Sequence, residues 1–293
     1  MSEPGEFRFG VNMVASAARA DWVEKCRKAE AAGYDVIGVA DHLGMPPPFP
    51  ALVLAAEATQ RVRLTTFVLN AAFYNPALLA REVAGTDQFT DGRIELGLGA
   101  GYVKAEFEAA GIPWEGAGRR VDHLERTVHE LKRLIADPAH QPQPAQKQGP
   151  PLLLAGRGNR LLTLAAQHAD IIGFTGTASG KDGGPLVLAD ADGILERVEF
   201  VRGLLGERVS QVELNILVQR VVITNDRQSA LAEVQSATNL TVEQLDELPT
   251  LLVGTHQQVA DQLVANRERF GFSYVTVLED NLERFAPVIE LVR

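Results

Sequence analysis

Eight short apolar runs recur along the chain, and segments with a helical period lie between them. The runs cover residues 7–13, 35–40, 63–70, 93–98, 151–154, 170–174, 212–219 and 273–278. Residues 21–32, which end at Gly33, and residues 121–135 carry apolar side chains at helical spacing. Eight such units fit a (β/α)8 barrel better than a doubly wound sheet, whose early dinucleotide fingerprint is absent. The alternation predicts one α/β domain, a TIM barrel, over residues 1–293.

The composition limits the classes of partner. A chain of 293 residues with 46% hydrophobic content can bury a large core. The formal net charge of −10 argues against nucleic acid or an anionic membrane surface as the main partner, because both require a basic surface. We therefore expect a small-molecule substrate.

Metal sites and targeting segments lack the expected sequence signals. Cys26 is the single cysteine, which excludes an intrachain disulfide and a thiolate metal cluster. No two histidines have a metal-like spacing with a carboxylate, so we predict no metal site. The chain has neither a basic start followed by an apolar leader nor a run of about 18 apolar residues. These features predict a cytoplasmic, soluble protein.

Residues 75–101 combine a helix start, a turn and a strand in one short stretch. Asn75 can cap a helix, and Pro76 suits the first helical position, where a missing N–H costs nothing. Asp91-Gly92 supplies a turn, after which residues 93–101 alternate as a strand. The stretch therefore predicts part of a parallel βα sheet.

Glycines gather on one face of this strand. Alternate positions point to opposite faces, one with Ile94, Leu96 and Leu98 and the other with Glu95, Gly97, Gly99 and Gly101. Because glycine weakens a strand, three on one face indicate that something lies against the backbone, and a flat ring is one candidate. The alternative is that the glycines only relieve crowding or permit a tight bend.

An ionisable pair, Asp41-His42, directly follows the second apolar run. Both side chains then emerge at the end of the barrel where active sites are built. An imidazole can accept or donate a proton near neutral pH, and an adjacent carboxylate can hold its charge or orientation. The alternative is that Asp41 caps a turn and His42 is an ordinary loop residue.

The segment after the fifth apolar run has the outline of a phosphate-binding loop. Gly156 and Gly158 allow backbone N–H groups to approach a phosphate, and Asn159 can start the following helix. Arg157 and Arg160 can add bidentate contacts. These features favour phosphate binding over an ordinary barrel loop.

Three connections are longer than an ordinary barrel loop. Residues 137–150 are rich in Pro and Gln and read as an exposed spacer without chemistry. Residues 173–193 are rich in Gly, contain Lys181 and follow the sixth run, so they are a candidate lid. Residues 43–50, with three consecutive prolines, are either a pocket wall or a rigid loop with structural duties only.

Common signatures of other enzyme classes are missing. The chain has no Gly-x-Ser-x-Gly elbow, no P-loop and no catalytic thiol with paired histidine and asparagine. A glycine face, a phosphate loop and one Asp-His pair together indicate a ring-bearing, phosphorylated cofactor that performs the redox step itself.

On these motifs the chain resembles the bacterial luciferase-like monooxygenase superfamily, and within it the coenzyme F420-dependent oxidoreductases. The matching segments are residues 7–11, Asp41-His42, 66–70, 75–101, Glu106-Phe107, 111–113, 156–160 and Gly254-Thr255. The resemblance covers nearly the whole chain and implies a (β/α)8 barrel of the luciferase-like type with insertions. Its members use either FMN or the deazaflavin F420, and they often form homodimers.

The resemblance also implies roles for individual residues. Asp41 and His42 match the acidic residue and histidine that flank the reacting face of the deazaflavin, so we expect His42 to transfer a proton. Residues 67–70 match a bulge with a non-prolyl cis peptide that supports the ring from behind. The implied cofactor contacts are Phe67, Val68, Leu69, Asn70, Gly97, Gly99, Ala100, Gly101, Tyr102, Gly156, Arg157, Gly158 and Asn159.

One departure from the family pattern affects the expected reaction. F420-dependent sugar-phosphate dehydrogenases have a glutamate where this chain has Tyr102, which can donate a hydrogen bond or only stack. The lysines and arginines that bind the substrate phosphate in those enzymes also have no clear match in this chain, so we infer no sugar phosphate. The expected function is hydride transfer between C5 of F420 and a small organic substrate. The alternatives are an FMN-dependent monooxygenase supplied by a partner reductase, and a cofactor-binding protein without turnover.

Overall fold

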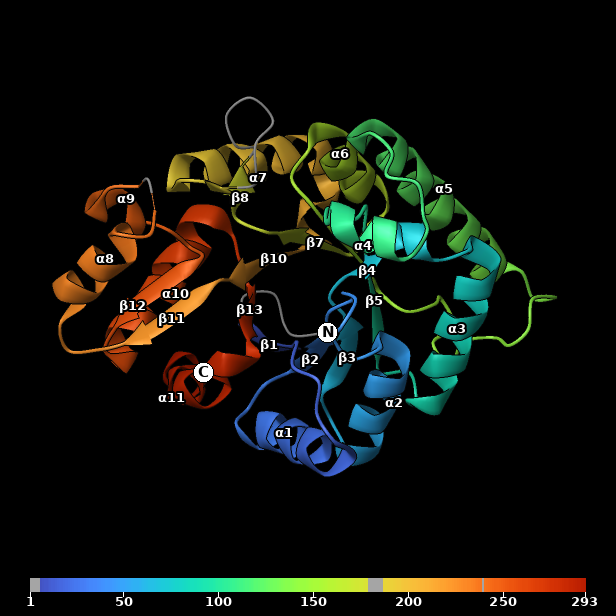
Figure 1. The fold of residues 1–293 in the computed structure, drawn as a ribbon, viewed down its shortest axis with the longest axis horizontal. Helices are drawn as coiled ribbons and strands as arrows, with labels where there is room; N and C mark the ends of the chain where they lie inside the picture. Colours follow the sequence, from blue (N-terminus) through green and yellow to red (C-terminus); the bar gives the residue numbers. More distant parts are fainter. Residues whose placement is uncertain (1–5, 179–186, 239) are drawn as a thin grey trace.

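Among the residues that the computed structural model describes, 6–178, 187–238 and 240–293, eight parallel strands close into a barrel (Figure 1). Their order is β3-β2-β1-β13-β10-β7-β6-β5, and pairing of β3 with β5 closes the ring. The strands are β1 (Arg8–Met13), β2 (Val36–Val39), β3 (Arg63–Thr66), β5 (Ile94–Gly99), β6 (Leu152–Ala155), β7 (Ile171–Phe174), β10 (Glu213–Val218) and β13 (Tyr274–Leu278). The predicted TIM barrel is confirmed.

Helices cover the outside of the barrel (Figure 1). The longer ones are α1 (Arg19–Ala31), α2 (Pro48–Ala58), α3 (Pro76–Phe89), α5 (Ala117–Ala136), α6 (Asn159–His168), α7 (Ala191–Leu205), α10 (His256–Phe270) and α11 (Leu282–Val292). Shorter helical segments are α4 (Lys104–Ala109), α8 (Arg227–Gln235), α9 (Val242–Asp246), η1 (Ala71–Phe73), η3 (Gly206–Ser210) and η4 (Glu279–Asn281). Within the described residues, no helix has the length and apolar character needed to cross a membrane.

The start of α3 follows the sequence prediction. The Asn75 side chain accepts hydrogen bonds from the N–H groups of Ala77 and Leu78 at 3.0 and 3.3 Å, and Pro76 is the first helical residue. These bonds satisfy donors that a helix leaves unpaired at its start. The cap therefore fixes where the chain leaves the site-forming end of the barrel and turns back along it.

Two short regions differ from the predicted alternation. The run at residues 63–70 divides into β3 and β4 (Leu69–Asn70). Strands β11 (Arg220–Ile223) and β12 (Leu251–Gly254) form a separate parallel pair beside the barrel, next to α8 and α9 (Figure 1). The pattern did not predict this pair, because residues 220–223 continue the apolar run of β10 without a turn signal.

The connections at residues 43–50 and 173–193 are only partly as expected. Residues 43–47 form a loop after β2, and Pro48 begins helix α2 with Pro47 at its N-cap, so the expected loop is shorter than predicted. Proline suits this place because its missing N–H would be unpaired anyway. In the candidate lid, β8 (Thr177–Ala178) pairs antiparallel with β9 (Val187–Leu188). Residues 179–186, with Lys181, lie outside the described residues.

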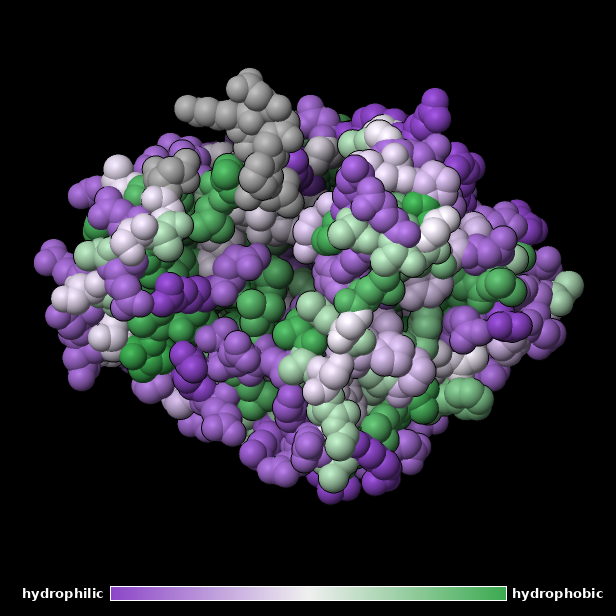
Figure 2. All heavy atoms as spheres, viewed as in Figure 1, coloured by the Kyte–Doolittle hydropathy of each residue, from purple (hydrophilic) through white to green (hydrophobic). Residues whose placement is uncertain are grey.

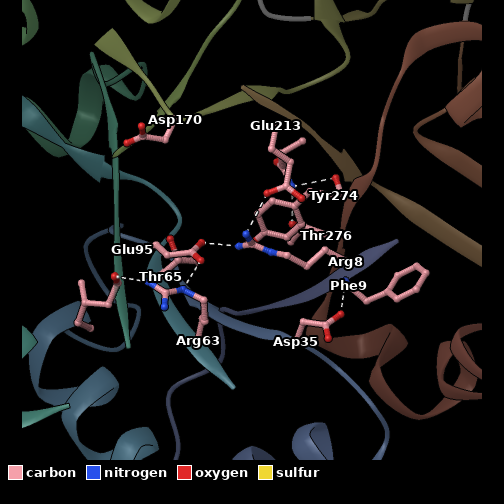
Figure 3. A network of polar contacts seen from close by, with 12 residues as sticks. Arg8, Phe9, Asp35, Arg63, Thr65, Glu95, Asp170, Glu213, Tyr274 and Thr276 are labelled. Carbon is pink, nitrogen blue, oxygen red and sulfur yellow. Dashed lines mark hydrogen bonds and ion pairs between the residues drawn. The ribbon is translucent and has the colours of Figure 1, made fainter. Parts of the chain in front are cut away.

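Charged side chains fill the N-terminal end of the barrel interior (Figure 3). Glu95, only 1% exposed, accepts from Arg8 at 2.5 Å and from Arg63 at 2.6 Å. Arg8 also reaches Glu213 at 2.9 Å and lies over the ring of Tyr274, 4.2 Å from its centroid. Burial raises the pKa of Glu213 to about 7, although the charge of Arg8 acts in the opposite direction. This network ties β1, β3, β5 and β10 together.

Candidate active site

The predicted site segments follow strands that are neighbours in the barrel. β2 pairs with β3, β4 pairs with β5, and β5 pairs with β6. Since the strands are parallel, the segments at residues 41–42, 67–70, 99–102 and 156–159 meet at the C-terminal rim of the barrel. On the face drawn in Figure 2, hydrophilic side chains dominate the edge, and hydrophobic ones form several patches between them.

Asp41 holds the segment after β3 in place. Its Oδ2 accepts a hydrogen bond from the backbone N–H of Asn70 at 3.0 Å, and the hydroxyl of Tyr74 also donates to it. Burial raises the pKa of Asp41, and these two hydrogen bonds offset part of that rise. The carboxylate is thus an acceptor for the chain itself and has a positioning role.

The two ring nitrogens of His42 have different surroundings: a carboxylate is hydrogen-bonded to Nδ1, while among the described residues Nε2 has only a longer contact. Its Nδ1 lies 2.8 Å from Oε1 of Glu106, which α4 supplies. A carboxylate partner favours a proton on Nδ1, so Nε2 can accept a proton. Glu106 belongs to a segment that carries the family resemblance, but no role could be predicted for it, because α4 brings it to His42 from 64 residues away.

Tyr102 stands beside the imidazole. Its hydroxyl is 3.5 Å from His42 Nε2, and the two rings meet edge to face with centroids 5.7 Å apart. The side chain is 64% exposed, and partial burial together with the charge of Glu106 raises its pKa. Tyr102 therefore keeps its proton at neutral pH and can donate a hydrogen bond.

The peptide between Phe67 and Val68 is cis, as the resemblance implies. It lies between β3 and β4, at the rim. The Asn70 side chain accepts from the N–H of Ala72 at 3.2 Å and so starts η1. The segment 67–70 is therefore a fixed bulge at the rim.

The glycines of β5 make room for this bulge. A Cβ at Gly97 would overlap the carbonyl oxygen of Thr66, and one at Gly99 would lie 2.9 Å from Cγ2 of Val68. A Cβ at Gly101 would overlap the side chain of Asn70. The expectation that a flat ring lies directly against this glycine face is therefore wrong, because the chain's own bulge occupies it. Any ring would rest on the bulge.

The loop at residues 156–159 leads into α6. No side chain among the described residues caps α6 at its N-cap, Gly158, so the first-turn N–H groups have no side-chain acceptor there. Free N–H groups at a helix start suit a phosphate. Arg157 and Gly156 line a small cavity with Arg197 from α7. These residues offer the backbone N–H groups and the positive charge that suit a phosphate group.

Two polar residues of this segment have other partners. Arg160 is directed to Asp122 at 2.5 Å and to the carbonyl oxygen of Gly118 at 3.2 Å, both on α5. Asn159 accepts from Arg197 at 2.5 Å. Arg160 thus ties α6 to α5, and the expectation that it contacts a phosphate is corrected.

Several curated relatives match part of the chain. The oxygenase component of a flavin-dependent trigonelline monooxygenase from Acinetobacter baylyi is 29% identical over 50% of this chain and 46% of its own length. A 5,10-methylenetetrahydromethanopterin reductase from Archaeoglobus fulgidus is 27% identical over 56% and 51%. An F420-dependent glucose-6-phosphate dehydrogenase from Kribbella flavida is 35% identical over 39% and 37%. The chain spans about half or less of the length of these relatives.

Solved structures agree with the fold along nearly the whole chain. An F420-dependent secondary alcohol dehydrogenase in complex with an F420-acetone adduct matches with a TM-score of 0.76 and 17% identity, over 98% of this chain and 99% of its own. The long-chain alkane monooxygenase LadA matches with a TM-score of 0.75 and 13% identity, over 99% and 92%.

A family model covers most of the chain. The model for luciferase-like monooxygenases matches residues 6–240, which include the Asp-His pair, the bulge, the glycine strand and the phosphate loop. Relatives within this group comprise both F420-dependent oxidoreductases and flavin-dependent monooxygenases. The chain belongs to the luciferase-like monooxygenase family.

Proposed function

We propose that this protein is an F420-dependent oxidoreductase that transfers a hydride between C5 of the deazaflavin and a small organic substrate. The observation that carries the proposal is the histidine whose Nδ1 is held by Glu106 and whose Nε2 lies 3.5 Å from the Tyr102 hydroxyl. Reduction of a carbonyl, or oxidation of an alcohol, moves one proton on the substrate oxygen along with the hydride. A positioned imidazole is suited to that proton.

The cofactor would be held at two places. The phosphate loop at residues 156–159 offers backbone N–H groups, and Arg157 adds positive charge. The bulge at residues 67–70 would support the ring. Asp41 holds it by a hydrogen bond, and it packs closely on β5 because Gly97 and Gly99 have no side chains. When bound, the deazaflavin supplies a carbon that accepts or donates the hydride.

The proton steps fall to the chain's own residues. Nε2 of His42 takes a proton from a substrate hydroxyl, or returns one to a substrate oxygen, while Glu106 holds the proton on Nδ1. The Glu106 carboxylate balances the positive charge of the imidazolium. The hydroxyl of Tyr102 orients the substrate oxygen by donating a hydrogen bond.

A flavin-dependent monooxygenase is the second candidate. The phosphate loop and the bulge also fit FMN, and a relative with that kind of activity, the trigonelline monooxygenase, is 29% identical over half of this chain. In that case a partner reductase would supply the reduced flavin. A third possibility is a protein that binds the cofactor without turnover.

Side-by-side fluorescence titration of the purified protein with F420 and with FMN separates these functions. A lower Kd for F420, followed by turnover of an alcohol or an unsaturated compound, supports the proposal. A lower Kd for FMN contradicts it and favours the monooxygenase. Tight F420 binding without turnover of any substrate in a broad panel favours the binding protein.

A further inference from the structure

A second cavity lies on the outside of the barrel, far from the candidate active site. Its volume is about 330 Å³, and it is enclosed by α5, by the segment that joins α5 to β6, and by the starts of β5, β6 and β7. Because Pro150 precedes β6 and Asp170 precedes β7, the cavity lies at the N-terminal end of the strands. The active-site rim is at the opposite end.

The walls of the cavity are mostly aliphatic. Leu96, Val128, Leu131 and Leu152 line it and are each at most 6% exposed, and Ile135 adds to the same surface. A volume of this size falls in the lower part of the usual range for ligand pockets, which starts at roughly 300 Å³. The aliphatic surface calls for an apolar body in the ligand.

The polar groups around the cavity are mainly cationic. Lys132 and Lys147 line it. Burial lowers the pKa of Lys132, the charge of Asp170 acts in the opposite direction, and the nearby charge of Arg208 adds to the lowering. Arg208 donates to the carbonyl oxygen of Ala169 at 2.8 Å. This concentration of positive charge occurs in a chain whose formal net charge is −10. An anionic group in the ligand would be attracted here.

The lysine ammonium keeps bonding capacity for such a group. Among the described residues, Lys132 Nζ donates one hydrogen bond, to the carbonyl oxygen of His168 at 2.8 Å, and an ammonium carries three donors. Asp170, the one carboxylate among the lining residues, accepts from the N–H of Leu152 at 2.8 Å. Its charge is thus partly engaged by the backbone.

The outer wall of the cavity is fixed in advance. Gln146, which precedes the lining residue Lys147, is held in one conformation. Its backbone N–H and its side-chain amide both donate to Asp87, each at 2.8 Å. Gly149 has φ +79°, and a Cβ there would lie 2.8 Å from Cγ2 of Ile135. The segment expected to be a simple spacer therefore packs against α5 at a defined distance, and a preformed pocket binds with a smaller ordering cost.

We propose that this cavity binds an organic monocarboxylate with an apolar body, with the carboxylate at Lys132 and Lys147 and the body against the leucines. The aliphatic walls disfavour a small inorganic anion, and the two lysines favour a carboxylate over a neutral compound of equal size. The inference does not depend on which cofactor the active site takes.

Calorimetric titration of the full chain with octanoate, and with 1-octanol as its neutral match, tests the proposal. Octanoate should bind at least about 10-fold more tightly than 1-octanol, since a charge-assisted hydrogen bond is roughly twice as strong as a neutral one. Equal binding of the two compounds, or no octanoate binding, overturns the proposal.

Matched variants locate the site. The double variant Lys132→Gln and Lys147→Gln should weaken octanoate binding about 10-fold, whereas Lys28→Gln, an exposed lysine on α1, should leave it unchanged. Ala136→Trp, which fills the cavity mouth, should abolish binding. Unaltered octanoate affinity in the double variant contradicts the assignment. Chemical denaturation of the same variants tests their folding independently of any cofactor.

Discussion

The two ends of the barrel use ionisable side chains in different ways. At the N-terminal end Glu95 is 1% exposed and is paired with both Arg8 and Arg63, so its charge is satisfied inside the protein. At the C-terminal rim His42 is 25% and Glu106 is 16% exposed, and they make one contact with each other. The closed network can hold strands together, whereas the rim pair still has bonding capacity for a substrate.

The middle of the barrel connects the two ends through packing. The strand that carries Glu95 near its start carries Gly97 and Gly99 further along the same face. Glu95 anchors the strand at the N-terminal end of the barrel, and the glycines leave room for the bulge at the C-terminal end. One strand therefore serves stability at one end and a candidate cofactor site at the other, so variants along it should separate the two roles.

The largest effect is expected for Gly97→Ala. The added Cβ would overlap the carbonyl oxygen of Thr66, which is backbone and cannot move without shifting β3, so we expect a loss of at least about 3 kcal/mol in the free energy of unfolding. Gly203→Ala in α7 is the control, because no described atom beyond its own stretch of helix lies within 4 Å of the added Cβ, and alanine favours a helix by about 0.5–1 kcal/mol. Chemical denaturation measures both; similar values for the two variants would refute the packing role of Gly97.

His42→Ala should be next in size. Removal of the proton-transferring imidazole is expected to lower turnover about 10²–10⁴-fold while the Kd for F420 changes less than about threefold. His129→Ala, which alters an exposed histidine that contacts His168, is the control. Steady-state kinetics and fluorescence titration give the two readouts. If turnover of His42→Ala equals that of the native protein, His42 has no part in the reaction.

Glu213 should make stability depend on pH. Its pKa in the folded protein is raised to about 7, so the folded state binds the proton more tightly than the unfolded state. The resulting stabilisation is full below about pH 4.5 and is lost as the pH rises through 7, with a size of about 1–3 kcal/mol after allowance for screening. Denaturation from pH 4.5 to 8 should show this fall in the native protein and a smaller one in Glu213→Gln. The same slope in both proteins would exclude Glu213 as the source.

The smallest effects distinguish Arg157 of the phosphate loop from Arg160 in the first turn of α6. Arg157→Gln should weaken F420 binding about 10-fold, since Arg157 lines the cavity at the loop. Arg160→Gln should change the Kd less than about twofold, because Arg160 is paired with Asp122. Fluorescence titration compares them, and the reverse order of affinities would require another phosphate site.

Much of the barrel could be predicted from local patterns, but contacts between distant segments could not. Asn75 and Pro76 marked the start of α3 because caps act within one turn of helix. The reason for Gly97 was missed, because Thr66, whose carbonyl oxygen fills the space opposite it, lies on another strand, 31 residues away. Glu106 was missed for a similar reason, since only the docking of α4 brings it to His42.

The ion-pair network at the N-terminal end of the barrel also could not be predicted from the sequence. Glu95 stood on the glycine face of its strand, but nothing in the local pattern indicated that Arg8 and Arg63 would reach it. Such pairs depend on the order in which the strands close the barrel. Strands β11 and β12 escaped prediction because short apolar runs do not reveal which sheet they join.

The most direct test of the difference between the two ends compares Glu95→Gln with Glu106→Gln by measuring the free energy of unfolding and F420-dependent turnover for both. Glu95→Gln should lose about 3–5 kcal/mol of stability, because it leaves buried arginine charge with less compensation. Glu106→Gln should stay within about 1 kcal/mol of the native stability and lose turnover roughly 10-fold or more. If Glu106→Gln instead destabilises the protein as much as Glu95→Gln and keeps its turnover, the separation of roles is contradicted.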